Sequence, residues 1–130
     1  MDVVKILVVD DEQEVLDVTC GFLRKKNYCT LGATTSNEAI EVLKKEEPQI
    51  VLLDVRLGND SGLDVLQKIK DFNRSIKVIM VTALNDEASI WQAKTLGADD
   101  YIAKPFTSTD LENLLLKKIA DLNLGKKNKI

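Results

Sequence analysis

The chain has 130 residues, enough for one domain with a substantial core, and its 21 acidic and 18 basic residues give a net charge of −3 at pH 7. This balance disfavours direct binding to the phosphate backbone of a nucleic acid. The sequence contains no histidine, which excludes Ser/His and Cys/His triads and imidazole zinc sites. No apolar run approaches the ~18 residues that cross a bilayer, and no signal peptide is evident, so we expect a cytoplasmic protein outside the membrane.

The first half of the chain alternates predicted strands and helices. The apolar run at 6–9 does not alternate with polar residues, which is typical of a central strand buried on both faces. Helical periodicity follows at 15–23, and a weaker strand nearer the sheet edge is expected at 28–33. Ser36 can cap a second helix, which Pro48 ends. Cys20 and Cys29 could form one disulfide, but we favour reduced thiols packed inside the domain.

The second half continues the alternation. Apolar runs at 50–53 and 78–81 predict two further central strands, and 101–103 predicts the last strand. The helices expected between and after them cover 63–69, 85–95 and 111–119. Two of these helices follow a hydroxyl placed three residues before a carboxylate, which is a capping signal: Ser61 with Asp64, and Thr107 with Asp110.

Five strands and five helices in alternation predict an α/β fold. Right-handed crossovers favour a flavodoxin-like, doubly wound parallel sheet with strand order 2-1-3-4-5, flanked by the helices. We expect the domain to cover 1–124. The short basic segment 125–130 is either a frayed terminus or the start of a linker.

Acidic residues stand where predicted strands end. Asp10 and Asp11 follow the first strand, and Asp54 follows the third. In the predicted order these two strands are neighbours, so their carboxyl ends meet at one edge. Carboxylates crowded there repel by about 4 kcal/mol per close pair, and Mg²⁺, which prefers oxygen ligands, relieves that repulsion. Alternatively, Asp10 and Asp11 simply cap the first helix.

Two further polar residues end predicted strands at the same edge. Lys104 offers a flexible positive charge suited to a phosphoryl oxygen, and Thr82 offers a hydroxyl donor. Each residue alone is uninformative, and their value lies in the set. A cis peptide bond between Lys104 and Pro105 would suit a tight strand-to-helix turn.

With these residues in place, the chain resembles the receiver domains of two-component response regulators, typified by the single-domain chemotaxis regulator. The resemblance covers roughly residues 5–122. It is carried, in order, by Ile6-Leu7-Val8-Val9-Asp10-Asp11-Glu12, Leu52-Leu53-Asp54, Ser61-Gly62-Leu63, Val81-Thr82-Ala83 and Gly97-Ala98-Asp99-Asp100-Tyr101-Ile102-Ala103-Lys104-Pro105-Phe106.

The resemblance implies that Asp54 accepts a phosphoryl group from a phosphohistidine on a sensor histidine kinase or histidine phosphotransfer protein. Mg²⁺ would be held by Asp11 directly, by Asp10 through water, by Asp54 and by the Arg56 backbone carbonyl. Lys104 would neutralise the transferred oxygens. The domain would promote only its own phosphorylation and dephosphorylation, and would not be an enzyme acting on other substrates.

The resemblance also implies a conformational switch. Thr82 would move toward the phosphoryl group and Tyr101 would turn inward, altering the face made by the fourth helix, last strand and fifth helix. That face would control a downstream protein or output domain, with the protein monomeric or dimerising on phosphorylation. Otherwise, Tyr101 is an aromatic packed at a strand end with its hydroxyl in water. Trp91 is either core or part of a partner-facing patch.

Several positions depart from the family's usual pattern. Gly58 replaces a proline and Ser61 an often acidic residue, so we expect a more mobile loop after Asp54. Arg56 and Leu84 occupy positions that tune the lifetime of the phosphoryl group. Our hypothesis is that Leu84 hinders the attacking water and that Arg56 reaches a phosphate or an acidic neighbour.

Three other functions compete with this interpretation. A phosphohydrolase that forms an aspartyl phosphate generally carries an Asp-x-Asp motif and a cap domain, whereas Asp10 and Asp11 are adjacent here. A flavodoxin-like cofactor binder needs hydroxyls and glycine after its first strand, where this chain is acidic. An interaction domain that has lost phosphorylation is the alternative that is hardest to exclude from the sequence, although every side chain that phosphorylation requires is present.

Overall fold

The structure, a computed structural model, describes residues 3–127. Its elements, in chain order, are β1 (Lys5–Val9), α1 (Gln13–Lys25), β2 (Cys29–Ala33), α2 (Ser36–Glu46), β3 (Ile50–Asp54), β4 (Arg56–Leu57), β5 (Asp60–Ser61), α3 (Gly62–Phe72), β6 (Lys77–Ala83), α4 (Glu87–Thr95), β7 (Asp100–Lys104) and α5 (Ser108–Lys127). Strands and helices therefore alternate as the sequence predicts, apart from the short pair β4 and β5.

The main sheet is parallel and has the order β2-β1-β3-β6-β7. Because β6 and β7 are its fourth and fifth strands along the chain, this confirms the predicted order 2-1-3-4-5. The first and third strands are neighbours, with Ile6 opposite Ile50 and Val9 opposite Leu53. The chain reverses direction across the sheet at this pair, which is the switch point of the fold.

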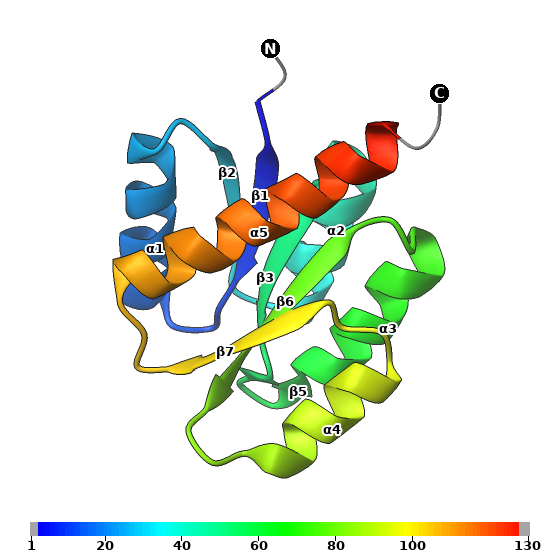
Figure 1. The fold of residues 1–130 in the computed structure, drawn as a ribbon. Helices are drawn as coiled ribbons and strands as arrows, with labels where there is room; N and C mark the ends of the chain where they lie inside the picture. The colour runs from blue at the N-terminus through cyan, green and yellow to red at the C-terminus, as the bar shows by residue number, and fades with distance from the viewer. Residues whose placement is uncertain (1–2, 128–130) are drawn as a thin grey trace.

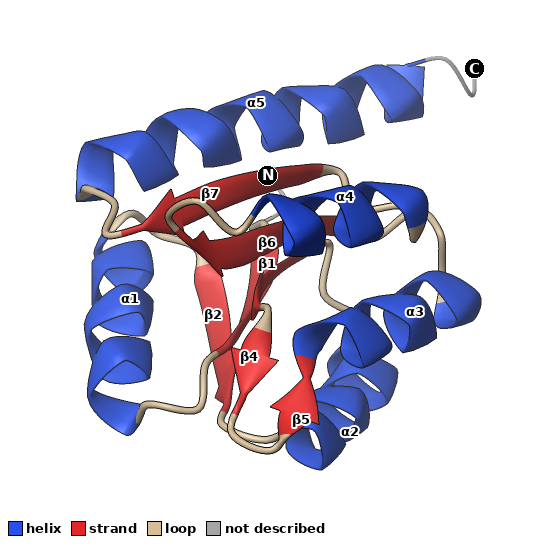
Figure 2. Ribbon diagram, turned by 90° about the horizontal axis from the view of Figure 1, so that it is seen from below, coloured by secondary structure: helices blue, strands red, loops and turns tan. Residues whose placement is uncertain are grey.

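Helices cover both faces of the sheet, with α1 and α5 on one side and α2, α3 and α4 on the other (Figures 1 and 2). Successive side chains of β1 point to opposite faces of the sheet. Ile6 and Val8 pack with the buried residues of α1 and α5, and Leu7 and Val9 pack with those of α2, α3 and α4. The apolar runs lack alternation because both faces are buried.

Helix caps agree with the sequence at two positions and differ at one. Thr107 and Asp110 form a reciprocal capping box, with N···O distances of 3.0 and 3.1 Å. Ser61 caps α3 by accepting a hydrogen bond from the Leu63 amide. The cap of α2, however, is Thr35, which accepts from the Glu38 amide, while the Ser36 hydroxyl donates to Asp60.

Helix α4 starts two residues later than the sequence predicts. Asn85 has a φ of 72°, a left-handed conformation that a helix cannot include, and Asp86 caps the helix instead. At the carboxyl end of the chain, α5 continues to Lys127, past the predicted domain end at 124. The rest of the predicted tail, 128–130, lies outside the described residues.

The segment after Asp54 contains structure that the sequence did not indicate. Strands β4 and β5 form a two-residue antiparallel ladder, joined by a turn in which Gly58 has a φ of 61°. Both cysteines are free thiols, as favoured above, but Cys29 is exposed and only Cys20 is packed inside. None of the helices in the described range is long and apolar enough to span a bilayer.

Candidate functional site

Three carboxylates meet at the carboxyl edge of the sheet. Each of Asp10, Asp11 and Asp54 offers an oxygen, and these oxygens all lie within 4.8 Å of one another. Asp10 directly follows β1 and Asp54 ends β3, so the neighbouring strands at the switch point bring them together. Asp10 and Asp54 are buried, whereas Asp11 is exposed at the rim.

Backbone amides orient all three carboxylates. Asp10 accepts a hydrogen bond from the Glu12 amide, Asp54 from the Arg56 amide and Asp11 from the Gly58 amide, each at 3.0 Å. The last bond links the end of β1 to the β4–β5 turn. These contacts hold each carboxylate in one orientation through one of its two oxygens.

Lys104 reaches the same cluster from the last residue of β7. Its Nζ lies 2.7 Å from Asp54 Oδ2 and 3.1 Å from Asp10 Oδ2. Partial burial lowers the pKa of Lys104, but hydrogen bonds and charge attraction from Asp54 and Asp10 outweigh that effect, so the pKa is raised overall. The ammonium therefore stays charged and offsets part of the repulsion among the acids. The Lys104-Pro105 peptide bond is cis, as expected.

An open cavity of about 420 Å³ lies over the cluster. Its lining comprises Asp11, Glu12, Asp54, Val55, Arg56, Gly58, Thr82, Ala83, Asp86 and Lys104. Buried Thr82 is therefore at the site, as is the exposed Arg56. Leu84 does not line this cavity and is 68% exposed.

Sequence reasoning missed Asp86 as a residue of this cavity. The sequence carried no signal for it, because Asp86 falls inside the helix predicted over 85–95. Its place at the cavity depends on the local backbone of the β6–α4 loop, where Asp86 caps α4 instead. The Asp86 carboxylate accepts a hydrogen bond from the Ser89 amide at 3.2 Å.

Glycine at position 62 allows α3 to start directly beneath Asp54. A Cβ built at Gly62 would clash with the Asp54 backbone carbonyl oxygen. The Gly62 amide donates to the Val55 carbonyl at 2.7 Å. This close approach fixes the position of the backbone at Asp54 and Val55, and with it the position of the Asp54 side chain.

Tyr101 lies outside the acidic cluster, on the β7 surface. Its side chain is 42% exposed, and the Lys94 ammonium from α4 lies 5.4 Å from the ring centroid. Thr82 and Tyr101 are on neighbouring strands, with Thr82 opposite Ala103 and Met80 opposite Tyr101. Trp91, also on α4, is 73% exposed and so belongs to the surface and not to the core.

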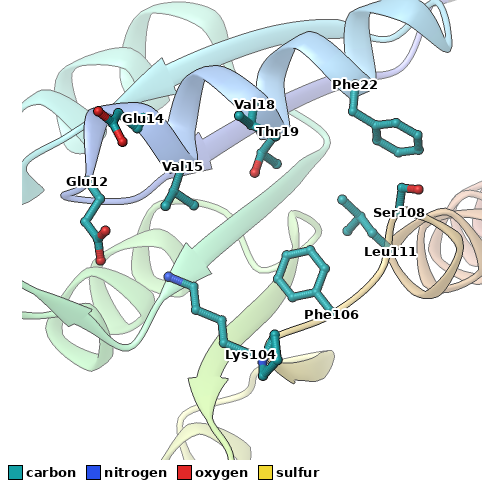
Figure 3. A pocket seen from close by; sticks show the side chains of 11 residues that line it. Glu12, Glu14, Val15, Val18, Thr19, Phe22, Lys104, Phe106, Ser108 and Leu111 are labelled. Atoms are coloured by element: carbon teal, nitrogen blue, oxygen red, sulfur yellow. The ribbon is translucent and has the colours of Figure 1, made fainter.

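A second and larger cavity, of about 730 Å³, opens between α1 and the turn from β7 to α5 (Figure 3). Its walls are largely apolar, with Val15, Val18 and Phe22 facing Phe106 across it. Lys104 lines both cavities. A molecule seated in this groove would lie next to the acidic cluster.

The donor set suits a hard divalent cation. Carboxylate oxygens at an open site match Mg²⁺, which takes one or two carboxylates and keeps several waters, and the cluster of Asp10, Asp11 and Asp54 supplies such oxygens within 4.8 Å of one another. The fold and the site together define a flavodoxin-like, doubly wound domain with an acidic site at its switch point that could hold a cation.

The chain belongs to the response regulator receiver domain family, whose family model matches residues 6–116. It is 40% identical over 107 residues to the regulatory protein VanR of Enterococcus faecium, covering 82% of this chain and 46% of VanR. The chain thus spans about half the length of this curated relative.

Solved structures show the same likeness. A CheY-like receiver domain protein of Methanospirillum hungatei superposes with a TM-score of 0.91 at 28% identity, covering 95% of this chain and 99% of that one. A receiver domain protein of Clostridium thermocellum superposes with a TM-score of 0.88 at 29% identity, and the match covers 94% of this chain and 98% of that one. The chain is therefore a receiver domain of two-component signalling, and the family to which it belongs is that of phosphorylation-dependent switches.

Proposed function

We propose that Asp54 accepts a phosphoryl group from a phosphohistidine on a sensor histidine kinase or histidine phosphotransfer protein. The observation that carries this proposal is the position of the Asp54 carboxylate, with one oxygen 2.7 Å from Lys104 Nζ and with Asp10 and Asp11 beside it. An Asp54 oxygen forms a bond to phosphorus while the bond from phosphorus to the histidine nitrogen breaks, leaving a neutral imidazole on the partner after protonation.

The residues around Asp54 perform the positioning and the charge stabilisation. Lys104 neutralises an oxygen of the transferred group, and Thr82 offers its hydroxyl to another. Asp10, Asp11, Asp54 and the Arg56 backbone carbonyl would hold Mg²⁺, which, when bound, spreads the charge that develops on the phosphoryl oxygens. The domain resets when water hydrolyses the acyl phosphate, and it acts on no other substrate.

We further propose that phosphorylation alters the face made by α4, β7 and α5. Thr82 moves toward the phosphoryl group, and Tyr101 turns from its exposed position into the space vacated next to it. The neighbouring positions of these residues on β6 and β7 support this coupling. The altered face then controls a downstream protein or output domain in the cytoplasm, or promotes a dimer.

The groove between α1 and the β7–α5 turn supports the choice of a protein phosphodonor. Its apolar wall includes Val18, which is 75% exposed, and it ends at Lys104. A partner helix packed there would bring its phosphohistidine to the edge of the acidic cluster.

The proposal is tested by the intact mass of the protein after incubation with acetyl phosphate or phosphoramidate and Mg²⁺. We expect the mass of one phosphate to be added to the parent protein and to Asp64→Asn, a control that neutralises an exposed acid on α3. Asp54→Asn should gain none, and EDTA should prevent the reaction. Unmodified parent protein would contradict the proposal, and steady turnover of a small phosphoester would support a phosphohydrolase instead.

A further inference from the structure

Arg56 and Asp86 carry opposite charges and line the same cavity above Asp54. Arg56 lies on β4, two residues beyond Asp54, and its amide is bound to the Asp54 carboxylate. Its guanidinium makes no ion pair within 4.0 Å in the described part of the chain. Within the described residues, no ion pair therefore holds the guanidinium to one anionic group of the cavity.

Asp86 is the anionic group that α4 contributes to this cavity. It caps the helix through the Ser89 amide, and its own amide donates to the carbonyl of Ala83, the residue after Thr82. Hydrogen bonds from Ser89 and, to a smaller extent, the Arg56 charge lower the pKa of Asp86, so the group is ionised at neutral pH. Asp86 thus joins the phosphorylation cavity to the first turn of α4.

We propose that Asp86 competes with the phosphoryl group on Asp54 for the side chain of Arg56. The inference rests on the proposed function, since it concerns the phosphorylated site. Before phosphorylation, Asp86 attracts Arg56 toward α4. A phosphoryl group carries roughly two negative charges, so it draws Arg56 away, and Asp86 then loses a favourable charge at the start of α4.

Two consequences follow from this competition. Asp86 weakens the hold of the site on a phosphoryl group, because Arg56 gives up its charge attraction to Asp86 when it turns toward the phosphoryl group. It also gives phosphorylation a direct route to α4 that does not pass through Tyr101. The inference adds Asp86 to the two tuning positions, Arg56 and Leu84, that the resemblance implies.

A double-mutant cycle with beryllium fluoride and Mg²⁺ tests the inference. This probe mimics a phosphoryl group on a carboxylate, and calorimetry measures its affinity. We expect Asp86→Asn to bind about two- to fivefold more tightly than the parent, the range for an exposed charge pair. Asparagine caps helices as well as aspartate, so α4 should persist. In an Arg56→Gln background, the same substitution should change the affinity by less than about twofold.

Glu87→Gln is the matched control, because it removes the same charge one residue further along α4, at a position that does not line the cavity. It should leave the affinity near that of the parent. The effect of Asp86→Asn should also shrink as salt rises from about 0.05 to about 0.5 M, because the screening length then falls from about 14 to about 4 Å.

The outcomes separate this inference from the proposed function. If the parent binds no beryllium fluoride and gains no phosphate, the proposed function fails. If the parent binds the probe but Asp86→Asn matches Glu87→Gln, or if its effect persists without Arg56, the competition between Asp86 and the phosphoryl group is refuted.

Discussion

At the scale of single residues, the site depends on a glycine as much as on its charges. Gly62 lies against the Asp54 backbone carbonyl, so any side chain there would push α3 away from the end of β3. The Asp54 carboxylate is held by the Arg56 amide just beyond this contact. Displacement of the backbone would therefore disturb both the helix and the phosphoacceptor.

We expect Gly62→Ala to lower the free energy of unfolding by about 1–3 kcal/mol, as overpacking does in a closely packed region. Urea denaturation followed by circular dichroism measures this change. Gly21→Ala is the matched control, because no atom lies within 4 Å of the added Cβ. Within α1 it should stabilise the protein by up to about 1 kcal/mol. Equal stability of the two variants would show that the contact at Gly62 is unimportant.

At the scale of elements, the buried Lys70 ammonium joins the end of α3 to the starts of β6 and β7. This junction lies at the edge of the sheet opposite the acidic cluster. Lys70, near the end of α3, is 8% exposed, and its Nζ lies 2.7 Å from Asp99 Oδ2 and 2.7 Å from the Ile76 carbonyl. The same Asp99 oxygen accepts from the Val78 amide of β6 at 2.8 Å. This junction fixes the point at which the chain enters β7.

We expect Lys70→Met to destabilise the domain by about 3 kcal/mol, because it leaves the partly buried Asp99 carboxylate without its closest cation. Lys68→Met, on the exposed side of the same helix, should change stability by no more than about 0.5 kcal/mol. Thermal unfolding of both variants provides the comparison. A Lys70→Met variant as stable as Lys68→Met would mean that Lys77, 3.9 Å from Asp99, suffices for the pairing.

At the scale of the whole molecule, the net charge is −3 and the charges are distributed unevenly. Three acids, Asp10, Asp11 and Asp54, gather at the carboxyl edge of the sheet. Lys104 offsets only part of their repulsion. Neutralising one acid should therefore raise the free energy of unfolding of the metal-free domain. The same change should reduce the stability that the domain gains when a cation binds.

Asp11→Asn tests this balance, since Asp11 is the exposed member of the cluster. In EDTA the variant should be more stable than the parent by up to about 1 kcal/mol. The parent should gain about 2.7 kcal/mol when Mg²⁺ reaches 100 times its Kd, and the variant should gain less at the same concentration. Asp64→Asn should gain as much as the parent. If Mg²⁺ stabilises Asp11→Asn and the parent equally, Asp11 is not a ligand.

The sequence predicted most where burial and strand ends determine the structure. Asp10 and Asp54 meet because each ends a strand at the switch point, and both strands are readable as unbroken apolar runs. The same reasoning cannot choose between adjacent hydroxyls, which is why Thr35, and not Ser36, proved to be the cap of α2. The one-residue difference depends on the backbone angle at which the helix begins.

Loop geometry was the other limit on prediction. The two-residue strands β4 and β5 are too short to show a periodicity, so their ladder left no trace in the pattern. In the β6–α4 loop, the left-handed Asn85 precedes Asp86, which lines the cavity while Leu84 does not. Which side chain of a loop faces a site depends on such angles, and composition does not specify them.

The strand order also shapes how the domain is made. β1 pairs with β2 on one edge, but its other neighbour, β3, comes from much later in the chain, and β6 and β7 follow later still. A growing polypeptide on the ribosome therefore exposes an apolar strand edge until most of the domain has emerged. Such an edge can pair with another nascent chain, so synthesis of this protein would benefit from chaperones that shield strands before the sheet is complete.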